Sequence, residues 1–321
     1  MYVVTGGAGF IGSAFVAKLN QLGIEDILIV DEFESSSKWK NVRNKFYTDY
    51  VHKDRFLQDL EAGQYRNISG VVHMGASSST TEMNMDYLMD NNVHYTARLA
   101  EYCINNGIRF VYASSAATYG DGEKGYSDED DIKGFLPLNP YGYSKQLFDL
   151  MALQKSYLDK IVGLKFFNVY GPNEYHKAGQ ASVVWHAYNQ IISQGVVKLF
   201  KSYRPEYADG EQKRDFIYVK DCAEAMWWFL ENPETNGLFN LGTGKARTWN
   251  DLVHAAFAAL SLEPKIEYID MPENLVNQYQ YFTEASMKKF EAIDTGINFH
   301  SLEDGVKDYI QGYLAGTSIY L

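Results

Sequence analysis

A glycine-rich turn between a short apolar strand and a helix constrains the fold of this chain more than any other feature. Tyr2 to Thr5 predicts a buried strand, and Ser13 to Leu22 has a helical pattern. Between them, Gly6, Gly9 and Gly12 form a G-x-x-G-x-x-G motif. The first glycine permits a tight turn, the second lets the backbone approach a pyrophosphate, and the third allows close helix-to-strand packing. The motif therefore predicts a dinucleotide-binding unit, with the pyrophosphate at the helix N-terminus.

A second buried strand, Ile27 to Asp31, ends in an acidic residue. Asp31 lies 19 residues beyond Gly12, about where a carboxylate meets the ribose of a bound dinucleotide. A carboxylate in that place favours NAD, because it repels a 2′-phosphate. Lys38 and Lys53 lie nearby in the sequence and would offset this repulsion. The residues alone therefore leave NADP and NAD open.

A third stretch carries residues suited to redox chemistry at an alcohol. Phe110 to Ala113 predicts a buried parallel strand, and Ser115 follows where that strand ends, the edge at which open α/β sheets place ligands. Asn139 predicts a helix N-cap, with a proline as the first helical residue. Tyr141 and Lys145 then lie on one face of the new helix.

This spacing suits removal of hydride from a carbinol, with Tyr141 taking or returning the hydroxyl proton. A free tyrosine has a pKa of about 10, and we expect the ammonium group of Lys145 to lower it. Ser115 would hydrogen-bond the same substrate oxygen. Tyr-x-x-x-Lys is common on ordinary helices, so its functional interpretation depends on the glycine motif at the start of the chain.

Composition narrows the class of protein. The net charge of -12 argues against a nucleic-acid partner or an anionic membrane. Hydrophobic residues make up 46% of 321 residues, enough for a sizeable core. Cys103 and Cys222 have no metal-type spacing and indicate reduced thiols in a cytoplasmic protein. Met1 leads directly into a strand, so we expect no signal peptide, and no apolar run approaches membrane-spanning length.

Alternating strands and helices in the first half predict an α/β fold, a Rossmann-like doubly wound parallel sheet. His73 ends one of these strands, Gly70 to His73, and is better explained as a hydrogen-bonded core residue than as a catalyst. After Pro172 the pattern changes, which indicates a smaller mixed α/β substrate domain. We expect the dinucleotide-binding domain at 1–167, with the chain returning at about 215–240 and 288–321, and the substrate domain at 168–214 with 241–287.

Together these motifs resemble the extended short-chain dehydrogenase/reductase family of nucleotide-sugar enzymes. The resemblance covers nearly the whole chain and includes the strand end Ser114 to Gly120, the turn Phe167 to Pro172 and the segment Arg214 to Val219. Within that family, the chain is most similar to the ADP-L-glycero-D-manno-heptose 6-epimerases. The stretches that carry this closer similarity are Gly75–Glu82, Met89–Asn92, His176–Lys177, Lys198–Phe200, Phe239–Gly244 and Gln278–Thr283. Ala178 stands where we would expect glycine.

The resemblance implies an isomerase that uses NADP, with NAD as the alternative, on an ADP-heptose substrate for the lipopolysaccharide inner core. It implies a homo-oligomer, with a pentamer as one form, and a second acid/base group at Lys177, which would also border the cofactor. Besides the glycines, it assigns to the cofactor Phe10, Ile11, Asp31, Glu32, Lys38, Lys53, Met74, Gly75, Ala76, Ser77, Ser78, Asn91, Lys145 and Val169. It assigns to the sugar nucleotide Ser115, Asn168, Gly179, His186, Phe200, Lys201, Ser202, Tyr203, Arg214 and Tyr279.

Arg214 suits a diphosphate, because a guanidinium can grip two oxygens; the alternative is a structural pair with Asp215 or Asp209. Three other functions share much of the pattern. A UDP-hexose 4-epimerase would have no need for Lys177. A 4,6-dehydratase would carry an Asp-Glu pair after the strand-end serine, where this chain has Ala116 and Ala117. A non-catalytic cofactor sensor would have no use for the serine, tyrosine and lysine together.

Overall fold

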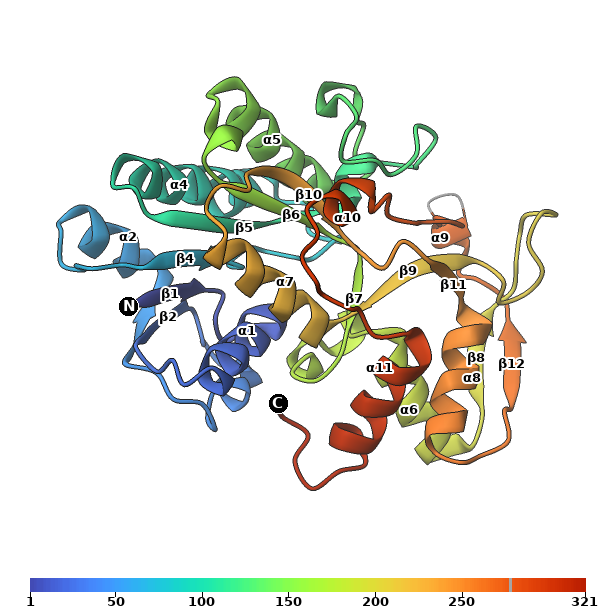
Figure 1. Cartoon of the computed structure of the whole chain (residues 1–321). Coiled ribbons are helices and arrows are strands. Elements are labelled where there is room, and N and C mark those ends of the chain that lie inside the picture. Colours follow the sequence, from blue (N-terminus) through green and yellow to red (C-terminus); the bar gives the residue numbers. More distant parts are fainter. Residues whose placement is uncertain (277–278) are drawn as a thin grey trace.

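A parallel sheet forms the centre of the computed structural model, which describes residues 1–276 and 279–321 (Figure 1). Gln278, part of one stretch of the family resemblance, lies outside the described residues. In the described part of the chain the sheet has seven strands in the order β10-β6-β5-β4-β1-β2-β3, all parallel to their neighbours. The strands are β1 (Tyr2–Thr5), β2 (Ile27–Asp31), β3 (Asp49–His52), β4 (Gly70–His73), β5 (Arg109–Ser115), β6 (Val162–Phe166) and β10 (Gly237–Leu241).

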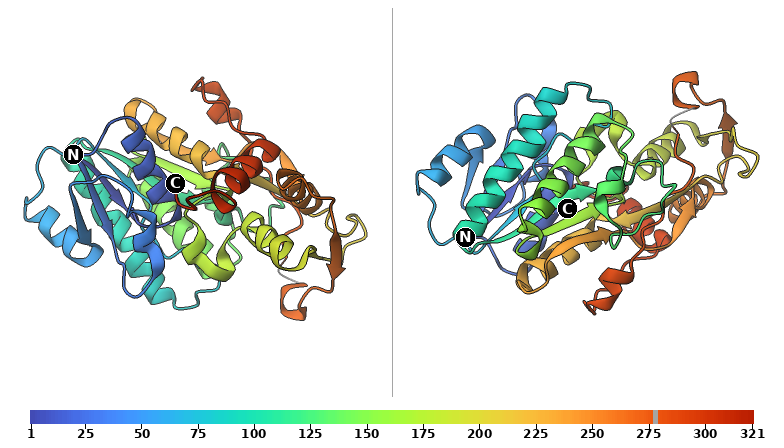
Figure 2. Two further views of the ribbon diagram at one scale, coloured as in Figure 1. Left: turned by 90° about the horizontal axis from the view of Figure 1, so that it is seen from below. Right: turned by 90° about the horizontal axis from the view of Figure 1, so that it is seen from above.

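Helices cover both faces of this sheet. On one face lie α1 (Phe10–Gln21) and α7 (Val219–Glu231); on the other lie α4 (Tyr95–Asn105) and α5 (Pro140–Gln154), as Figures 1 and 2 show. Every residue of β2, β4, β6 and β10 is buried, as expected for parallel strands that are covered on both sides. The Rossmann-like doubly wound sheet predicted from the sequence is confirmed.

Local signals placed the start of α5 correctly. Asn139 caps α5 as predicted, its side chain accepting a hydrogen bond from the Gly142 N–H, and a proline follows it. α1 begins at Phe10 and not at the predicted Ser13, because the glycine turn takes up fewer residues than the hydropathy pattern indicated. The helical segment between β4 and β5 begins with α3 (Met85–Leu88), which is capped by Asn84, and reaches α4 through the π-helical stretch Met89–His94.

The remaining elements form two smaller sheets and the helices around them. β7 (Asn168–Tyr170), β9 (Lys213–Tyr218) and β11 (Ala246–Thr248) form one sheet, and β8 (Val197–Phe200) pairs with β12 (Ile266–Ile269) in the other. The helices are α2 (Lys53–Glu61), α6 (Val183–Gln194), α8 (Trp249–Ala259), α9 (Glu273–Val276), α10 (Lys288–Ala292) and α11 (Leu302–Tyr309).

A second core joins α6, α8 and α11 to β9 and also includes Phe10 and Ala14 of α1. The smaller mixed α/β part is therefore packed directly against the helix that follows the glycine turn. The exact domain boundaries given above stay a prediction. Among the described residues, no helix combines the length and the hydropathy needed to span a lipid bilayer.

Candidate active site

A cleft of about 430 Å³ opens at the carboxyl ends of β1, β2, β4 and β5. The sheet order reverses beside β1, since β2 and β3 lie on one side of it and β4, β5 and β6 on the other. Open α/β sheets bind ligands at such a switch point, because the loops that leave neighbouring strands diverge there. The cleft therefore lies where the glycine motif predicted a dinucleotide.

Two of the motif glycines lie where a side chain has no room. Gly6 has φ +63°, and a Cβ atom on it would lie 2.6 Å from the main-chain nitrogen of Gly75. A Cβ on Gly12 would lie 2.2 Å from the carbonyl oxygen of Gly6. The backbone thus forms a close cradle directly before α1, whose first N–H groups favour an anion. The residues present fit a dinucleotide pyrophosphate.

The acidic end of β2 is neutralised by lysines. Asp31 Oδ2 accepts the Ala8 N–H at 2.9 Å, and Oδ1 accepts the Glu32 N–H at 2.8 Å. Lys38 Nζ lies 2.7 Å from Asp31 Oδ1, and Lys53 Nζ lies 3.0 Å from Glu32 Oε2. Asp31 therefore ties the glycine turn to β2, and both of its oxygens already have partners.

Most of the residues assigned to the cofactor from the sequence border this cleft. The exception is Val169, which lies half-buried in β7. Lys53 also donates to Asn91 Oδ1 at 2.9 Å, which joins the start of α2 to the π-helical stretch. The lining also includes nine residues that were not assigned to the site from the sequence: Thr5, Val30, Tyr87, Tyr95, Ala113, Ser114, Phe166, His176 and Gln180. Tyr87 had a usable signal, because it precedes Asn91 by four residues and so shares its helix face.

Ser115, Tyr141 and Lys145 meet where β5 ends beside the first turn of α5. Tyr141 and Lys145 border the cleft, and the Ser115 hydroxyl accepts the Ala117 N–H at 3.1 Å. Burial raises the pKa of Tyr141, and the neighbouring Ser115 hydroxyl opposes that shift. Burial thus outweighs the lowering that we expected, and the net shift of the Tyr141 pKa is upward. The ammonium group of Lys145 instead donates to the Ala113 carbonyl at 2.8 Å, and burial lowers its own pKa to about 8.

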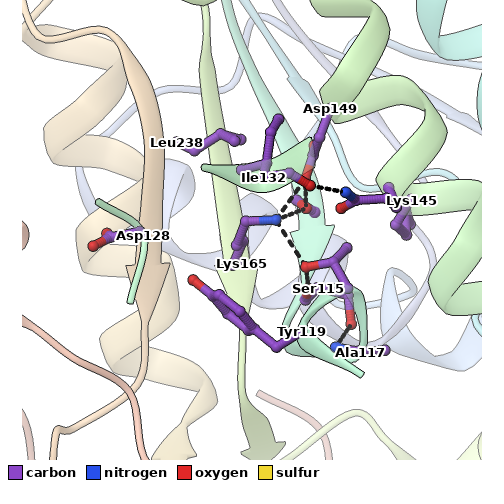
Figure 3. A network of polar contacts seen from close by, with 12 residues as sticks. Ser115, Ala117, Tyr119, Asp128, Ile132, Lys145, Asp149, Lys165 and Leu238 are labelled. Carbon is purple, nitrogen blue, oxygen red and sulfur yellow. Dashed lines mark hydrogen bonds and ion pairs between the residues drawn. The ribbon is translucent and has the colours of Figure 1, made fainter. Parts of the chain in front are cut away.

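A buried ion pair lies directly behind these residues. Lys165 Nζ in β6 contacts Asp149 Oδ2 in α5 at 2.6 Å, and neither side chain is exposed (Figure 3). Asp149 also accepts from the hydroxyls of Tyr112 and Ser114, and Lys165 donates to Thr118. This network joins β5, β6 and α5, and so fixes the strand end that carries Ser115 relative to the helix that carries Tyr141.

Lys177 reaches the same cleft from a different part of the chain. It lies in a short 3-10 segment, Tyr175–Gln180, and its Nζ is 5.8 Å from the centre of the Phe10 ring. Burial lowers the pKa of Lys177, and the Glu174 carboxylate opposes the shift. Burial also lowers the pKa of His176 to about 4, with Lys177 and Lys38 adding to the effect. A lysine with a lowered pKa is suited to proton transfer near neutral pH.

Several residues assigned to the sugar nucleotide gather beside β9. The guanidinium carbon of Arg214 lies 5.6 Å from the Trp249 ring centre and 5.3 Å from that of Tyr279. Arg214 donates to the carbonyls of Lys213 and Gln280, so the alternative of a structural pair with Asp215 or Asp209 is not what the structure shows. Asp215 instead accepts main-chain N–H groups, including those of Thr243 and Gly244.

Phe200 extends this group, whereas the other predicted substrate residues are more dispersed. Phe200 packs edge-on to Tyr279, Lys201 pairs with Asp270 at 3.0 Å, and the Tyr203 N–H donates to the Tyr281 hydroxyl. The Ser202 N–H donates to Asp209. Asn168 is exposed in β7, 3.4 Å from the Thr283 hydroxyl. Gly179 is exposed in the segment of Lys177, and His186 lies on α6 with its ring against Trp185.

A dinucleotide cradle joined to a serine, tyrosine and lysine at the end of β5 defines a nucleotide-dependent oxidoreductase or epimerase. The family model for the NAD dependent epimerase/dehydratase family matches residues 2–242. The chain belongs to the NAD-dependent epimerase/dehydratase family. A nicotinamide cofactor is thus consistent with both the family and the cleft.

Individual relatives have a more specific name than the family. The chain is 58% identical to the ADP-L-glycero-D-manno-heptose-6-epimerase of Nitratidesulfovibrio vulgaris (strain DP4), and the match covers 100% of both chains. It is 50% identical to the enzyme of the same name from Fusobacterium nucleatum, again over 100% of both. The crystal structure of the Helicobacter pylori ADP-L-glycero-D-manno-heptose-6-epimerase has a TM-score of 0.80 at 28% identity, covering 96% of this chain and 94% of that one. The resemblance inferred from the sequence is confirmed.

Proposed function

We propose that this chain interconverts ADP-D-glycero-β-D-manno-heptose and ADP-L-glycero-β-D-manno-heptose by transient oxidation at carbon 6, with NADP tightly bound. One observation carries the proposal: Tyr141 of α5 and Lys177 of the 175–180 segment line the same dinucleotide cleft. The substrate is supported by the shared name of the relatives that match the whole chain. The family resemblance also supports a cytoplasmic homo-oligomer.

The two acid/base side chains meet a chemical requirement of the reaction at carbon 6. Carbon 6 bears a hydroxyl and no neighbouring carbonyl, so its C–H is not acidic and direct deprotonation is unfavourable. The nicotinamide ring, when bound, supplies the acceptor for the hydride that leaves carbon 6 and returns it to the other face. Tyr141 would exchange the hydroxyl proton in one orientation of the sugar, and Lys177 in the other. Ser115 would hydrogen-bond the reacting oxygen, and Arg214 would hold the diphosphate.

The charges at the end of β2 support NADP over NAD. Asp31 would repel a 2′-phosphate if its charge were free. Here Lys38 pairs with Asp31 and Lys53 pairs with Glu32, so each acid has a cationic partner. Both oxygens of Asp31 also accept main-chain N–H groups, which leaves them less available to a ribose hydroxyl.

Replacement of Lys38 by alanine tests this preference. Lys38→Ala leaves the Asp31 charge uncompensated, so we expect the Kd for NADP to rise at least about tenfold more than the Kd for NAD, which is about 1.4 kcal/mol. Calorimetric titration of cofactor-free protein with each dinucleotide measures the difference. Lys40→Ala, two residues away, is the control. An equal loss for both cofactors would contradict the assignment.

A proton NMR time course in deuterated water tests the reaction itself. Purified protein is mixed with ADP-D-glycero-β-D-manno-heptose, without added cofactor. We expect the L-glycero epimer to form with no deuterium at carbon 6, because the same hydride returns. Deuterium at that carbon would contradict hydride return. No reaction here, together with turnover of a UDP-hexose, would favour the 4-epimerase, and no reaction with either would favour the cofactor sensor.

A further inference from the structure

A single buried carboxylate closes the loop that carries Lys177. The chain leaves β7 at Tyr170 and enters α6 at Val183, and Lys177 lies between them. Glu174, in the same loop, is 1% exposed. Its Oε1 accepts the Ser182 hydroxyl at 2.7 Å and the Gly171 N–H at 3.4 Å, and its Oε2 accepts the Ser182 N–H. One side chain thus bridges the beginning and the end of the loop.

The loop is also anchored to the dinucleotide cradle. Asn173 is fully buried with φ +77°, and its side-chain amide donates to the Ser13 hydroxyl of α1 at 2.9 Å. Asn41 donates to the Asn173 carbonyl at 3.0 Å and to the Ala8 carbonyl at 2.9 Å. One end of the loop is therefore held against the glycine turn, and Glu174 ties the other end to it.

The negative charge of Glu174 acts electrostatically on a small group of side chains. Burial raises its pKa, and the donors from Ser182 and Gly171 oppose the shift. The Lys177 N–H donates to the Glu174 carbonyl at 2.9 Å, and the negative charge of the Glu174 carboxylate raises the pKa of Lys177 against the effect of burial. Besides burial, the charge of Glu174 also raises the pKa values of the phenols of Tyr175, from the 3-10 segment of Lys177, and Tyr309, from α11. Lys177 is the cation of this group.

We propose that Glu174 is a positioning residue that holds Lys177 in the cleft by closing the Gly171–Ser182 loop. The inference rests on the proposed role of Lys177 as the second acid/base group. Glu174 does not border the cleft and touches no reacting atom, so it acts only through the lysine. Its loss should therefore impair the proton transfers of Lys177 and leave those of Tyr141 unchanged.

Glu174→Gln separates this role from general stability. Glutamine keeps the shape, but it has only one acceptor oxygen, so its NH₂ group must face either the Ser182 N–H or the Gly171 N–H, and the negative charge is lost. We expect single-turnover oxidation to be slowed on the order of 10- to 100-fold for one epimer only, because misplacement of a catalytic group has effects of that size. The epimer affected should be the one that Lys177→Ala slows. Glu263→Gln, an exposed glutamate, is the control.

A second readout needs no substrate. Lys177 in the cofactor-loaded protein is labelled with an amine-reactive reagent across a pH series, and the product is measured by mass spectrometry. This reports the pH at which the neutral amine appears. Removal of the opposing carboxylate should shift half-labelling of Lys177 to lower pH. Ser182→Ala, which removes one hydroxyl donor and keeps the charge, should loosen the loop with a smaller shift.

Equal slowing of both epimers, with labelling of Lys177 unchanged, would overturn the inference and leave Glu174 a structural residue. Wild-type rates for both epimers in Glu174→Gln would overturn it as well. Failure of the wild-type protein to convert either epimer would instead overturn the proposed function. In that case the labelling shift alone would decide whether Glu174 positions Lys177.

Discussion

At the scale of single residues, Ala178 has a backbone conformation that suits glycine. Its φ is +48° and its ψ is −117°, within the 3-10 segment that carries Lys177. L-residues with a side chain rarely adopt such angles, and the strain is on the order of 1 to 3 kcal/mol. The sequence resemblance led us to expect glycine at this position. The structure gives the physical reason, because the chain turns there between Lys177 and the start of α6.

Ala178→Gly should therefore stabilise the protein. Relief of strain exceeds the entropic cost of a glycine, which is about 0.5 to 1 kcal/mol, so we expect a net gain of about 1 kcal/mol in the free energy of unfolding. Urea denaturation measures it. Ala181→Gly, at φ −65° just before the α6 cap, is the matched control and should destabilise. A loss at position 178 equal to that at position 181 would show that no strain is present.

At the scale of elements, the Asp149–Lys165 pair joins α5 to β6. The desolvation of two buried charges is tolerated because each has several hydrogen-bond partners. The pair thus contributes to the relative position of β5 and α5, the two elements that carry Ser115, Tyr141 and Lys145.

Lys165→Met should cost about 3 to 5 kcal/mol, because it leaves the Asp149 charge buried without its partner. Chemical denaturation of the cofactor-loaded protein provides the measurement. Lys160→Met, an exposed lysine just before β6, should stay within about 0.5 kcal/mol of the wild type. Addition of Asp149→Asn to Lys165→Met should recover part of the loss. A cost below about 1 kcal/mol for Lys165→Met would contradict the interpretation.

His73 links β4 to β1 and α4 and makes their packing sensitive to pH. Its Nδ1 is 2.6 Å from the Thr5 hydroxyl and its Nε2 is 2.8 Å from that of Thr96, as expected for a core histidine. Burial, with a smaller effect of Lys145, lowers its pKa to about 3. The unfolded chain therefore binds a proton below about pH 6.5 that the folded chain does not bind.

Between about pH 6.5 and pH 3, this histidine should lower the stability as the pH falls. The expected slope is about 1.4 kcal/mol for each pH unit. Denaturation series at several pH values, for the wild type and for His73→Gln, isolate its contribution. The variant should be less stable at pH 7 but should show a shallower loss in acid. Parallel pH profiles for the two proteins would contradict the assignment.

At the scale of the whole molecule, the last residues return to the start of the chain. Figure 1 places this end beside α1. Lys45 donates to the Leu321 carbonyl, and the Leu321 N–H donates to Asn173 Oδ1 at 3.0 Å. The Tyr320 ring packs against Tyr175 and below the Arg43 guanidinium. The tail thus covers both the segment after β2 and the loop that carries Lys177.

Deletion of Ile319–Leu321 should destabilise the protein by about 1 to 3 kcal/mol, because a buried donor on Lys45 and a buried acceptor on Asn173 lose their partners. Burial holds the pKa of Lys45 at about 8, so this lysine would be the group most affected. Thermal and urea unfolding measure the effect, with Thr317→Ala as the control. A change below about 0.5 kcal/mol would show that the tail is only loosely placed.

The sequence by itself determined the structural features that depend on residues close together in the chain. The glycine turn after β1, the Asn139 cap of α5 and the shared face of Tyr141 and Lys145 follow from local backbone geometry, which a few adjacent residues specify. The buried strands follow from continuous apolar runs, and these predicted the parallel sheet.

Only the tertiary structure decided what depends on contacts between distant segments. It neutralised Asp31 with Lys38, gave Lys145 a hydrogen bond to the Ala113 carbonyl, and raised the Tyr141 pKa by burial. It also brought Asn41 against Asn173, at the start of the loop that carries Lys177. Such charges and contacts depend on distances across the fold, because solvation and Coulomb energies follow spatial separation and not sequence spacing.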